Sequence, residues 1–221
     1  MATVYQVKDR YQIKAEKNGT NDGITTDNYR FCLAYNEAQN KFLTIHLQNR
    51  GIDDVRYIQN FLVLNHKIPY TSTLNDPTLW DFDLPKNYFD LADPTAIAVK
   101  GECKAKIYLV EMQTENLKEM LQDEYSKPSF EYEEALYTVN SDKLSIYTTD
   151  FAIEELTLNY YRYPNQIRLL DENNPESDFD NTQKIEWDDK SLDDIISIMV
   201  FNLDINENNP RYQLQTLRTQ K

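Results

Sequence analysis

The sequence predicts an α+β fold made of an N-terminal helical hairpin, a mixed and mostly antiparallel β-sheet, and an apolar C-terminal helix followed by an extended tail. Apolar residues recur at three- and four-residue steps over residues 27–64 and again over residues 188–206, which is typical of helices. Between these segments, residues 95–163 contain alternating apolar runs, as strands do. Helices and strands fall in separate blocks, which indicates the α+β class.

Composition limits the number of domains and the classes of partner. The 221 residues are 40% hydrophobic, which is enough for one packed domain. We expect an N-terminal arm over residues 1–24, a single α+β domain over residues 25–206 and a tail over residues 207–221. The net charge of −14 repels phosphates at long range, so tight binding of nucleic acid is not expected. Alternatively, the acidity serves solubility alone.

Two amphipathic segments predict the helical hairpin. The first helix is expected to begin at Asp27, a good capping residue, and to end near Gly51, because glycine tolerates the left-handed conformation that closes helices. The second is expected from Asp53 to about Leu64, before Pro69. The apolar positions of the two segments are Phe31, Ala34, Tyr35, Ala38, Phe42 and Ile45, then Val55, Ile58, Phe61, Leu62 and Leu64.

The middle of the chain predicts short elements. Residues 70–85 are expected to form a loop, and residues 84–89 the start of a short helix with Pro85 at its first position. Residues 95–112 predict two strands joined by a bend at Gly101. Thr114 is then expected to cap a short helix that contains Leu117, Met120 and Leu121.

The last third predicts strands and then a helix. Residues 135–147 predict a hairpin, and residues 151–163 a longer strand that Pro164 ends. A solvated acidic loop is expected over residues 171–184. The final helix, over residues 188–206, begins with aspartates, which the helix dipole favours there. It is apolar nearly all round, so we expect burial on more than one side, with an inner face of Leu192, Ile195, Ile196, Met199 and Leu203.

The motifs of common enzyme classes are absent from the sequence. Only four glycines occur, with no GxGxxG and no GxxxxGK[ST] pattern, so nucleotide chemistry and a bound cofactor are not expected. His46 and His66 have no zinc-ligand spacing, so no metal site is expected. Cys32 and Cys103 form no CxxC motif, which suits a reducing compartment. No window approaches the ~18 apolar residues of a membrane span.

Carboxylates leave one enzymatic alternative open. Glu111, Glu115, Glu154 and Glu155 are expected near strand ends, where a glycan-cleaving pair could lie. With 37 acidic residues in the chain, however, such pairs arise by chance. Residues 171–180 share acidity with a calcium loop but lack its alternating order and its glycine. We therefore expect no catalytic and no metal-binding residues.

Aromatic residues indicate contacts with other proteins. Among the 16 tyrosines, alternation places Tyr161 and Tyr163 on one face of the 151–163 strand and Tyr160 on the other with Arg162. One face must leave the core or meet a partner, and tyrosine and arginine are enriched at interfaces. The alternative is an edge strand with one wet face. The residues that we expect at interfaces are Tyr161, Arg162, Tyr163, Ile196, Met199, Phe201, Arg211 and Tyr212.

The tail differs in charge from the rest of the chain. Residues 208–221 contain Arg211, Arg218 and Lys221 and no acidic residue, whereas the whole chain is acidic. A basic end on an acidic body could dock on a neighbouring copy. The alternative is a frayed terminus.

A series of short pieces follows in a characteristic order over about residues 84–213. They are Leu84-Pro85-Lys86-Asn87-Tyr88-Phe89, Ile107-Tyr108-Leu109, Lys127-Pro128-Ser129, Leu144-Ser145-Ile146-Tyr147, Leu158-Asn159-Tyr160-Tyr161-Arg162-Tyr163-Pro164, Asp194-Ile195-Ile196 and Asn209-Pro210-Arg211-Tyr212-Gln213. In that order they resemble virion structural proteins of short-tailed bacteriophages, above all the ring (head–tail connector) proteins of crAss-like phages. That family usually has a more charged or carboxylate-and-histidine segment where this chain has Asp188, Asp189 and Asp193, so no site residue is carried over.

The resemblance implies a non-enzymatic subunit of a ring of identical copies below the portal, in the part of the tail that DNA crosses. It implies a virion protein made in the host cytoplasm, with copies of itself, the portal and adjacent ring proteins as partners and with no membrane contact. Head-to-tail contacts that close would build such a ring, and an acidic wall would keep DNA from adhering. The alternatives are an acidic binding module, such as a DNA mimic or inhibitor, and a glycan-cleaving enzyme.

Overall fold

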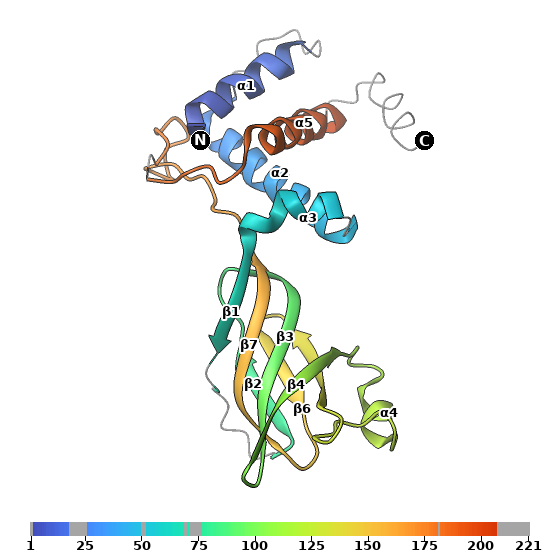
Figure 1. Cartoon of the computed structure of the whole chain (residues 1–221). Coiled ribbons are helices and arrows are strands. Elements are labelled where there is room, and N and C mark those ends of the chain that lie inside the picture. The colour runs from blue at the N-terminus through green and yellow to red at the C-terminus, as the bar shows by residue number, and fades with distance from the viewer. Residues whose placement is uncertain are drawn as a thin grey trace, which may run out of the picture. The chain divides into compact units, whose positions relative to one another are not determined.

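The computed structural model describes residues 2–17, 26–49, 52–68, 70, 77–180 and 182–206. The elements follow in the order α1 (Val4–Lys17), α2 (Asn28–Asn49), α3 (Ile52–Ile58), a 3-10 turn (Gln59–Phe61), β1 (Leu62–Ile68), β2 (Leu79–Asp83), β3 (Tyr88–Lys100), β4 (Cys103–Glu111), α4 (Leu117–Gln122), β5 (Glu134–Asn140), β6 (Lys143–Tyr147), β7 (Ala152–Arg162) and α5 (Asp189–Asn206). Helices and a mostly antiparallel sheet confirm the predicted α+β class (Figure 1).

The chain forms two compact units. A helical unit consists of Met1–Asn60 and Pro164–Lys221, and a sheet unit consists of Phe61–Tyr163. The sequence predicted a single domain over residues 25–206 instead. The difference arises because the sheet unit, one continuous segment, is inserted between the two segments that make up the helical unit.

Helix α1 occupies the segment for which the sequence predicted a polar arm. Most of its residues are polar, but Val7 and Tyr11 are fully buried, and Val4 and Ala15 nearly so. These four positions recur at three- and four-residue steps and form one narrow apolar stripe. The Tyr11 ring lies 5.8 Å from that of Phe31 on α2, so α1 belongs to the core of the helical unit.

Helix α2 confirms the first predicted helix, including its cap. The Asp27 carboxylate accepts a hydrogen bond from the backbone N–H of Arg30 at 2.6 Å, as a capping side chain does. Figure 1 shows α2 beneath α1 and α5 in the helical unit. The large buried residues that α2 and α5 contribute to its core are Phe31, Tyr35, Phe42, Leu43, Leu192, Ile195, Ile196 and Met199.

An extended segment crosses α2 before α5 begins, and two side chains of α2 hold it. The Asn36 amide donates to the carbonyl of Ile167 and accepts from its N–H, both at 2.9 Å. The Gln39 amide donates to the carbonyl of Asn165 at 3.2 Å and accepts from the Trp187 indole N–H at 3.2 Å. Because these groups replace water as partners, this polar segment can lie against the core.

The second predicted helix is shorter than expected. Its helical part ends at Phe61, and Leu62 and Leu64, which the sequence placed in the helix, lie in strand β1. β1 pairs antiparallel with β7, with Leu62 opposite Tyr161. The pairing satisfies backbone groups of both strands, which another helical turn could not do for β7. A distant strand thus decides where the helix stops.

The sheet unit contains one described sheet of seven strands in the order β1-β7-β3-β4-β5-β6-β2. Its neighbouring strands are antiparallel apart from β4 and β5, which are parallel. Parallel neighbours need a crossover connection, which residues 112–133 and their helix α4 provide. The predicted strand pair is confirmed as β3 and β4, and Gly101 joins them with a φ of 62°. The hairpin of β5 and β6 and the long strand β7 are confirmed as well.

The sheet curls so that its two edge strands share one core. Ile68 of β1 and Phe82 of β2 both belong to the buried cluster that contains Ile107 of β4. Near the two edges, the Tyr70 ring lies 4.8 Å from that of Trp80 and 5.8 Å from that of Phe82. Aromatic side chains therefore cover the core where no ladder joins β1 to β2.

Two expectations for the middle of the chain are wrong. Residues 79–83, expected in a loop, form β2, which pairs along its length with β6. Residues 84–89 form no helix, because the Tyr88 N–H donates to the Pro85 carbonyl at 2.8 Å and closes a turn before β3. Both segments follow the backbone pairing of the sheet, which their short local patterns do not reveal.

Candidate protein–protein interface

The tyrosine- and arginine-rich strand is β7, which lies between β1 and β3 in the sheet. It is therefore not an edge strand, contrary to the alternative that the sequence left open. Alternation along β7 is as predicted: Tyr160 faces the core at 3% exposure, and Tyr161 follows on the opposite face, half-buried. The Tyr160 hydroxyl donates to the Asn87 side chain at 3.1 Å, so its polar end is satisfied inside the unit.

Arg162 and Tyr163 lie where β7 ends. The Arg162 guanidinium lies 5.3 Å from the centre of the Phe61 ring and donates to the Tyr163 carbonyl at 3.1 Å. The Tyr163 ring packs edge-on against Phe89 with centroids 4.7 Å apart, and 41% of the residue stays exposed. Neighbouring rings thus hold both side chains in place. A side chain that is ordered before binding loses less entropy when a partner covers it.

Two phenols of the sheet unit are kept neutral. Burial raises the pKa of Tyr88 to about 12, with further contributions from the charges of Asp90 and Glu111. Burial likewise raises the pKa of Tyr137, and Glu111 adds to the effect. Hydroxyls with raised pKa values donate hydrogen bonds at neutral pH and do not act as bases. The raised pKa values of Tyr88 and Tyr137 therefore indicate a packing role for both phenols and not acid–base chemistry.

The last helix is covered by the chain itself. Ile196 and Met199 are each 1% exposed, and α5 packs against α1 and α2. Neither side chain is therefore on the surface, where the sequence analysis placed an interface with other copies. An apolar helix gives the same pattern whether its own unit or a partner covers it, which explains the error. Phe201 is half-buried, and Arg211 and Tyr212 lie outside the described residues.

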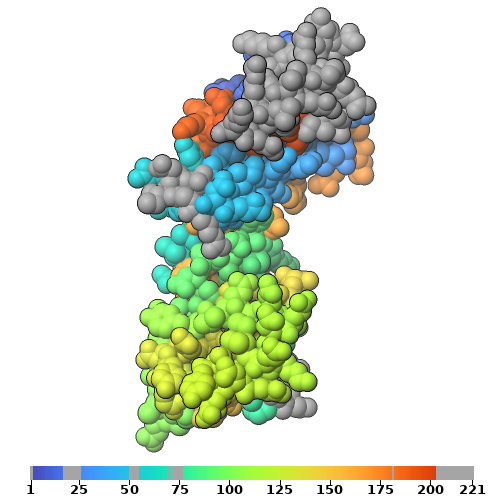
Figure 2. All heavy atoms as spheres, turned by 90° about the vertical axis from the view of Figure 1, so that its right-hand side faces the viewer, coloured from blue at the N-terminus to red at the C-terminus, as the bar shows by residue number. Residues whose placement is uncertain are grey.

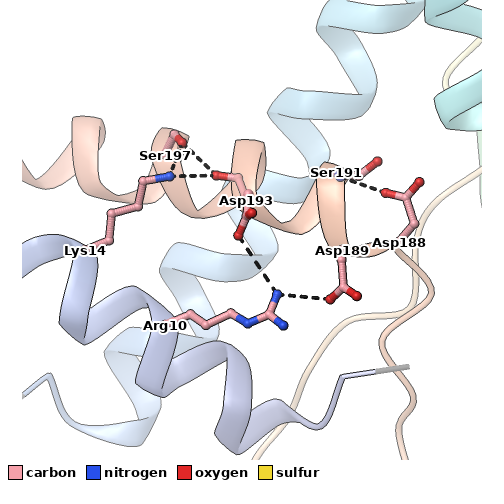
Figure 3. Close-up of polar contacts among 7 residues, drawn as sticks. All are labelled: Arg10, Lys14, Asp188, Asp189, Ser191, Asp193 and Ser197. Carbon is pink, nitrogen blue, oxygen red and sulfur yellow. Dashed lines mark hydrogen bonds and ion pairs between the residues drawn. The ribbon is translucent and has the colours of Figure 1, made fainter.

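Polar contacts join α1 to the first turns of α5 (Figure 3). The Arg10 guanidinium lies 3.0 Å from an Asp189 oxygen and 4.0 Å from an Asp193 oxygen. The Lys14 ammonium donates to the Asp193 carbonyl at 3.0 Å and to the Ser197 hydroxyl at 2.6 Å. These aspartates are thus engaged by basic residues of the same chain, which gives the acidic start of α5 a structural role.

Asp188 has a separate role at the same place. Its carboxylate accepts a hydrogen bond from the backbone N–H of Ser191 at 2.7 Å, as Figure 3 shows. That bond and one from the Ser191 side chain lower the pKa of Asp188. Asp188 is therefore the N-cap of α5, whereas the sequence placed it inside the helix.

The most exposed aromatic residues lie on the crossover between β4 and β5, for which the sequence predicted no interface. Tyr125 is 94% exposed and Tyr132 is 82% exposed, and Tyr108 and Val110 on the outer face of β4 are exposed too. Figure 2 shows the atoms of β4 and of the crossover, in yellow-green, beside each other over one face of the sheet unit. The signal in the sequence that could have indicated this surface is a pair of tyrosines in an acidic segment without strand or helix periodicity.

The crossover is anchored at its ends but packs loosely in its middle. The Tyr108 N–H donates to the Glu133 carbonyl at 2.7 Å, and Ser129 and Glu134 exchange backbone hydrogen bonds at 2.9 and 3.1 Å. At its start, the Met112 N–H donates to the Tyr137 carbonyl at 2.9 Å. Between Met112 and Ser129, none of the six residues of α4 is buried. Asn116, and not the predicted Thr114, precedes this helix, without a side-chain cap. The middle of the crossover therefore offers apolar and aromatic area to a partner.

The candidate carboxylate pair of β7 is bound by lysines. Glu154 lies 2.7 Å from the Lys104 ammonium, and Glu155 lies 2.8 Å from that of Lys67. The four side chains line a depression of about 550 Å³ on the outer face of the sheet. Each carboxylate thus serves as an ion-pair partner, Glu155 with the neighbouring strand β1 and Glu154 with β4, which lies beyond β3.

The histidines and cysteines occupy separate places. The His46 ring lies edge-on to Phe42 at 4.3 Å, and His66 lies 5.7 Å from Tyr160. Cys32 is buried, which raises its pKa to about 11, and Cys103 is exposed. Within the described part of the chain, no group of three or more His, Cys, Asp or Glu could hold a metal ion. None of the helices described is long and apolar enough to cross a membrane.

No protein-family model and no curated protein sequence matches the chain.

Proposed function

We propose that the chain is a virion structural protein, a subunit of the ring that connects head and tail in a short-tailed bacteriophage. It is made in the host cytoplasm, assembles with copies of itself, and contacts the portal or an adjacent ring. It performs no catalysis. The proposal rests on the resemblance over residues 84–213 and on the surface of the sheet unit.

The observation that carries the proposal is the exposure of tyrosines on the sheet unit. Tyr125, Tyr132, Tyr108 and Tyr163 leave between 41% and 94% of their surface in solvent. Tyrosine supplies a large rigid contact area with a polar end, and such residues dominate the energetics of protein interfaces. A structural subunit, which is covered on several sides by its neighbours, makes use of such a surface.

The charge of the chain supports a position along a DNA path. Its 37 acidic and 23 basic residues give a net charge of −14. A wall of that sign repels phosphates, so DNA passes without a tight complex. The same charge would also separate subunits at low salt, which makes apolar and aromatic contacts between copies necessary.

Imaging of virions tests the proposal. Electron cryomicroscopy of particles whose genome encodes the chain is expected to place it in a ring between capsid and tail, with β4 and the crossover in contact with another chain. Mass spectrometry of purified particles should find it in stoichiometric amounts. Its absence from particles, or its presence as a lone protein without a ring, overturns the proposal.

A second candidate function is an acidic binding module that imitates DNA. It is favoured by Glu115, Glu119, Glu124 and Glu133 of the crossover, for which no ion pair with another described residue is found. Such a module would bind a basic nuclease or polymerase and release it at high salt. Capture of such an enzyme, together with absence from particles, would favour this function over the ring.

A further inference from the structure

The crossover lobe, residues 112–133, packs on the core of its unit near its end, where the Phe130 ring lies 5.9 Å from that of Phe151, but has little apolar cover over the rest of its length. Tyr125 and Tyr132 are almost fully exposed, and no residue of α4 is buried. Helix α4 still carries Leu117, Met120 and Leu121, each half-buried. A short helix with such a face is marginal without further packing. Figure 2 shows the lobe on the outside of the sheet unit, where a second polypeptide has access to it.

The lobe is also acidic. It contains six acidic and two basic residues. Asp123 is engaged by the Ser126 hydroxyl at 2.6 Å, and Glu131 by the Lys100 ammonium at 2.7 Å. The other four acids are exposed and are in no ion pair with a described residue: Glu115, Glu119, Glu124 and Glu133. An occupant of the lobe must therefore combine apolar side chains with positive charge.

The end of this same chain has that composition. Residues 208–221 contain three basic residues and no acid, with Tyr212, Leu214 and Leu217 between Arg211 and Arg218. Charge of opposite sign steers two surfaces together and fixes their register. Fifteen residues, 207–221, can reach at most about 50 Å when fully extended.

We propose that the C-terminal segment 207–221 of one copy docks on the crossover lobe of a second copy. Arg211 and Arg218 pair with free carboxylates of the lobe, and the apolar residues between them cover Tyr125 and α4. Tail and lobe are different surfaces, so the contact is head-to-tail and repeats around a ring. In this respect the contact rests on the proposed function, and it names the surfaces that would join neighbouring subunits.

Photo-crosslinking of the purified full-length chain tests the contact. A benzophenone amino acid replaces Tyr212, and this protein is mixed with an equal amount of isotopically labelled wild type before irradiation. Crosslinked peptides that join the tail of one isotope to residues 112–133 of the other are expected. A tail linked only to its own copy, or to residues outside the lobe, overturns the proposal.

Charge exchange supplies the controls. Glu119→Arg with Glu124→Arg in the lobe should lower the yield of crosslinks between copies about fivefold, which is the effect of losing two exposed ion pairs. Arg211→Glu with Arg218→Glu in the partner should restore it. The matched control, Glu172→Arg with Glu176→Arg, makes the same charge change on the exposed loop of the helical unit and should leave the yield unchanged.

An equal loss in the matched control would show attraction by net charge alone and would overturn the proposal. So would a failure of the exchanged pair to restore the yield. Circular dichroism checks that each variant is folded, and Tyr125→Ser, which removes no buried group, tests the apolar part separately. Because these measurements use the purified chain, a negative result is distinguishable from absence of the chain from virions.

Discussion

Met199 decides whether the last helix is part of the chain's own core. The residue is 1% exposed on α5, which packs on α1 and α2. Met199→Ala removes Cγ, Sδ and Cε, and at about 0.8 kcal/mol for each buried methylene-sized group the loss is about 2.4 kcal/mol. The cavity left behind adds about 1 kcal/mol, so we expect the free energy of unfolding to fall by about 3 kcal/mol.

The assay is denaturant unfolding followed by tryptophan fluorescence. Trp187 is buried in the helical unit, 5.2 Å from the Phe42 ring, and the other tryptophan, Trp80, is replaced by phenylalanine in all variants. Asp194→Ala is the control because Asp194 is exposed on the same helix, and its effect should stay within about 0.5 kcal/mol.

The midpoint for the parent protein should not depend on protein concentration, because the cover of Met199 comes from the same chain. An effect of Met199→Ala below about 0.5 kcal/mol would refute the reasoning. A midpoint that rises with concentration would refute it as well, since mass action would then show that other copies cover the helix.

Three further predictions test single features. Asp188→Ala should lower stability by about 1 kcal/mol, and Asp188→Asn much less, because asparagine also caps helices. The pKa of Asp188 is lower in the folded state than in the unfolded state. The charge of Asp188 therefore stabilises the fold above the unfolded pKa, and this contribution is lost as pH falls through the folded pKa. The Asn variant should lack that pH dependence in thermal melts. Gly101→Ala should cost about 1 kcal/mol in urea unfolding through its φ of 62° alone, since an added Cβ meets nothing within 4 Å; an unchanged midpoint would contradict this. In ultraviolet titration Tyr88 should ionise near pH 12, and Tyr88→Phe should remove a late step and leave the early ones.

The sequence predicts the elements whose pattern is local. Strands β3 and β4 around Gly101, the hairpin before Thr148 and helix α5 are confirmed because each has its own period and its own turn residues. Helix α1 was missed because Val4, Val7, Tyr11 and Ala15 form a stripe only one residue wide in a polar segment. The helical spacing of these four residues is visible in the sequence. The signal for a helix is weak, however, because the mean hydropathy of the surrounding residues is low.

Pairing between distant strands could not be predicted. Leu62 and Leu64 have the spacing of a helix, yet β7 recruits them into β1. The parallel pair of β4 and β5 was missed for the same reason, because register and strand order depend on the whole sheet. This pair shapes the surface of the sheet unit, since it requires the crossover that holds Tyr125 and Tyr132.

Burial of α5 changes where assembly contacts can lie. The sequence offers two apolar or aromatic groups for an interface, and periodicity cannot tell which one the chain covers itself. In the structure α1 and α2 cover Ile196 and Met199, and β7 is covered by strands on both of its edges. The crossover lobe keeps its tyrosines exposed, and Tyr163 does so at the end of β7. If copies assemble as we propose, substitutions of Tyr125 or Tyr132 should affect assembly with little effect on folding.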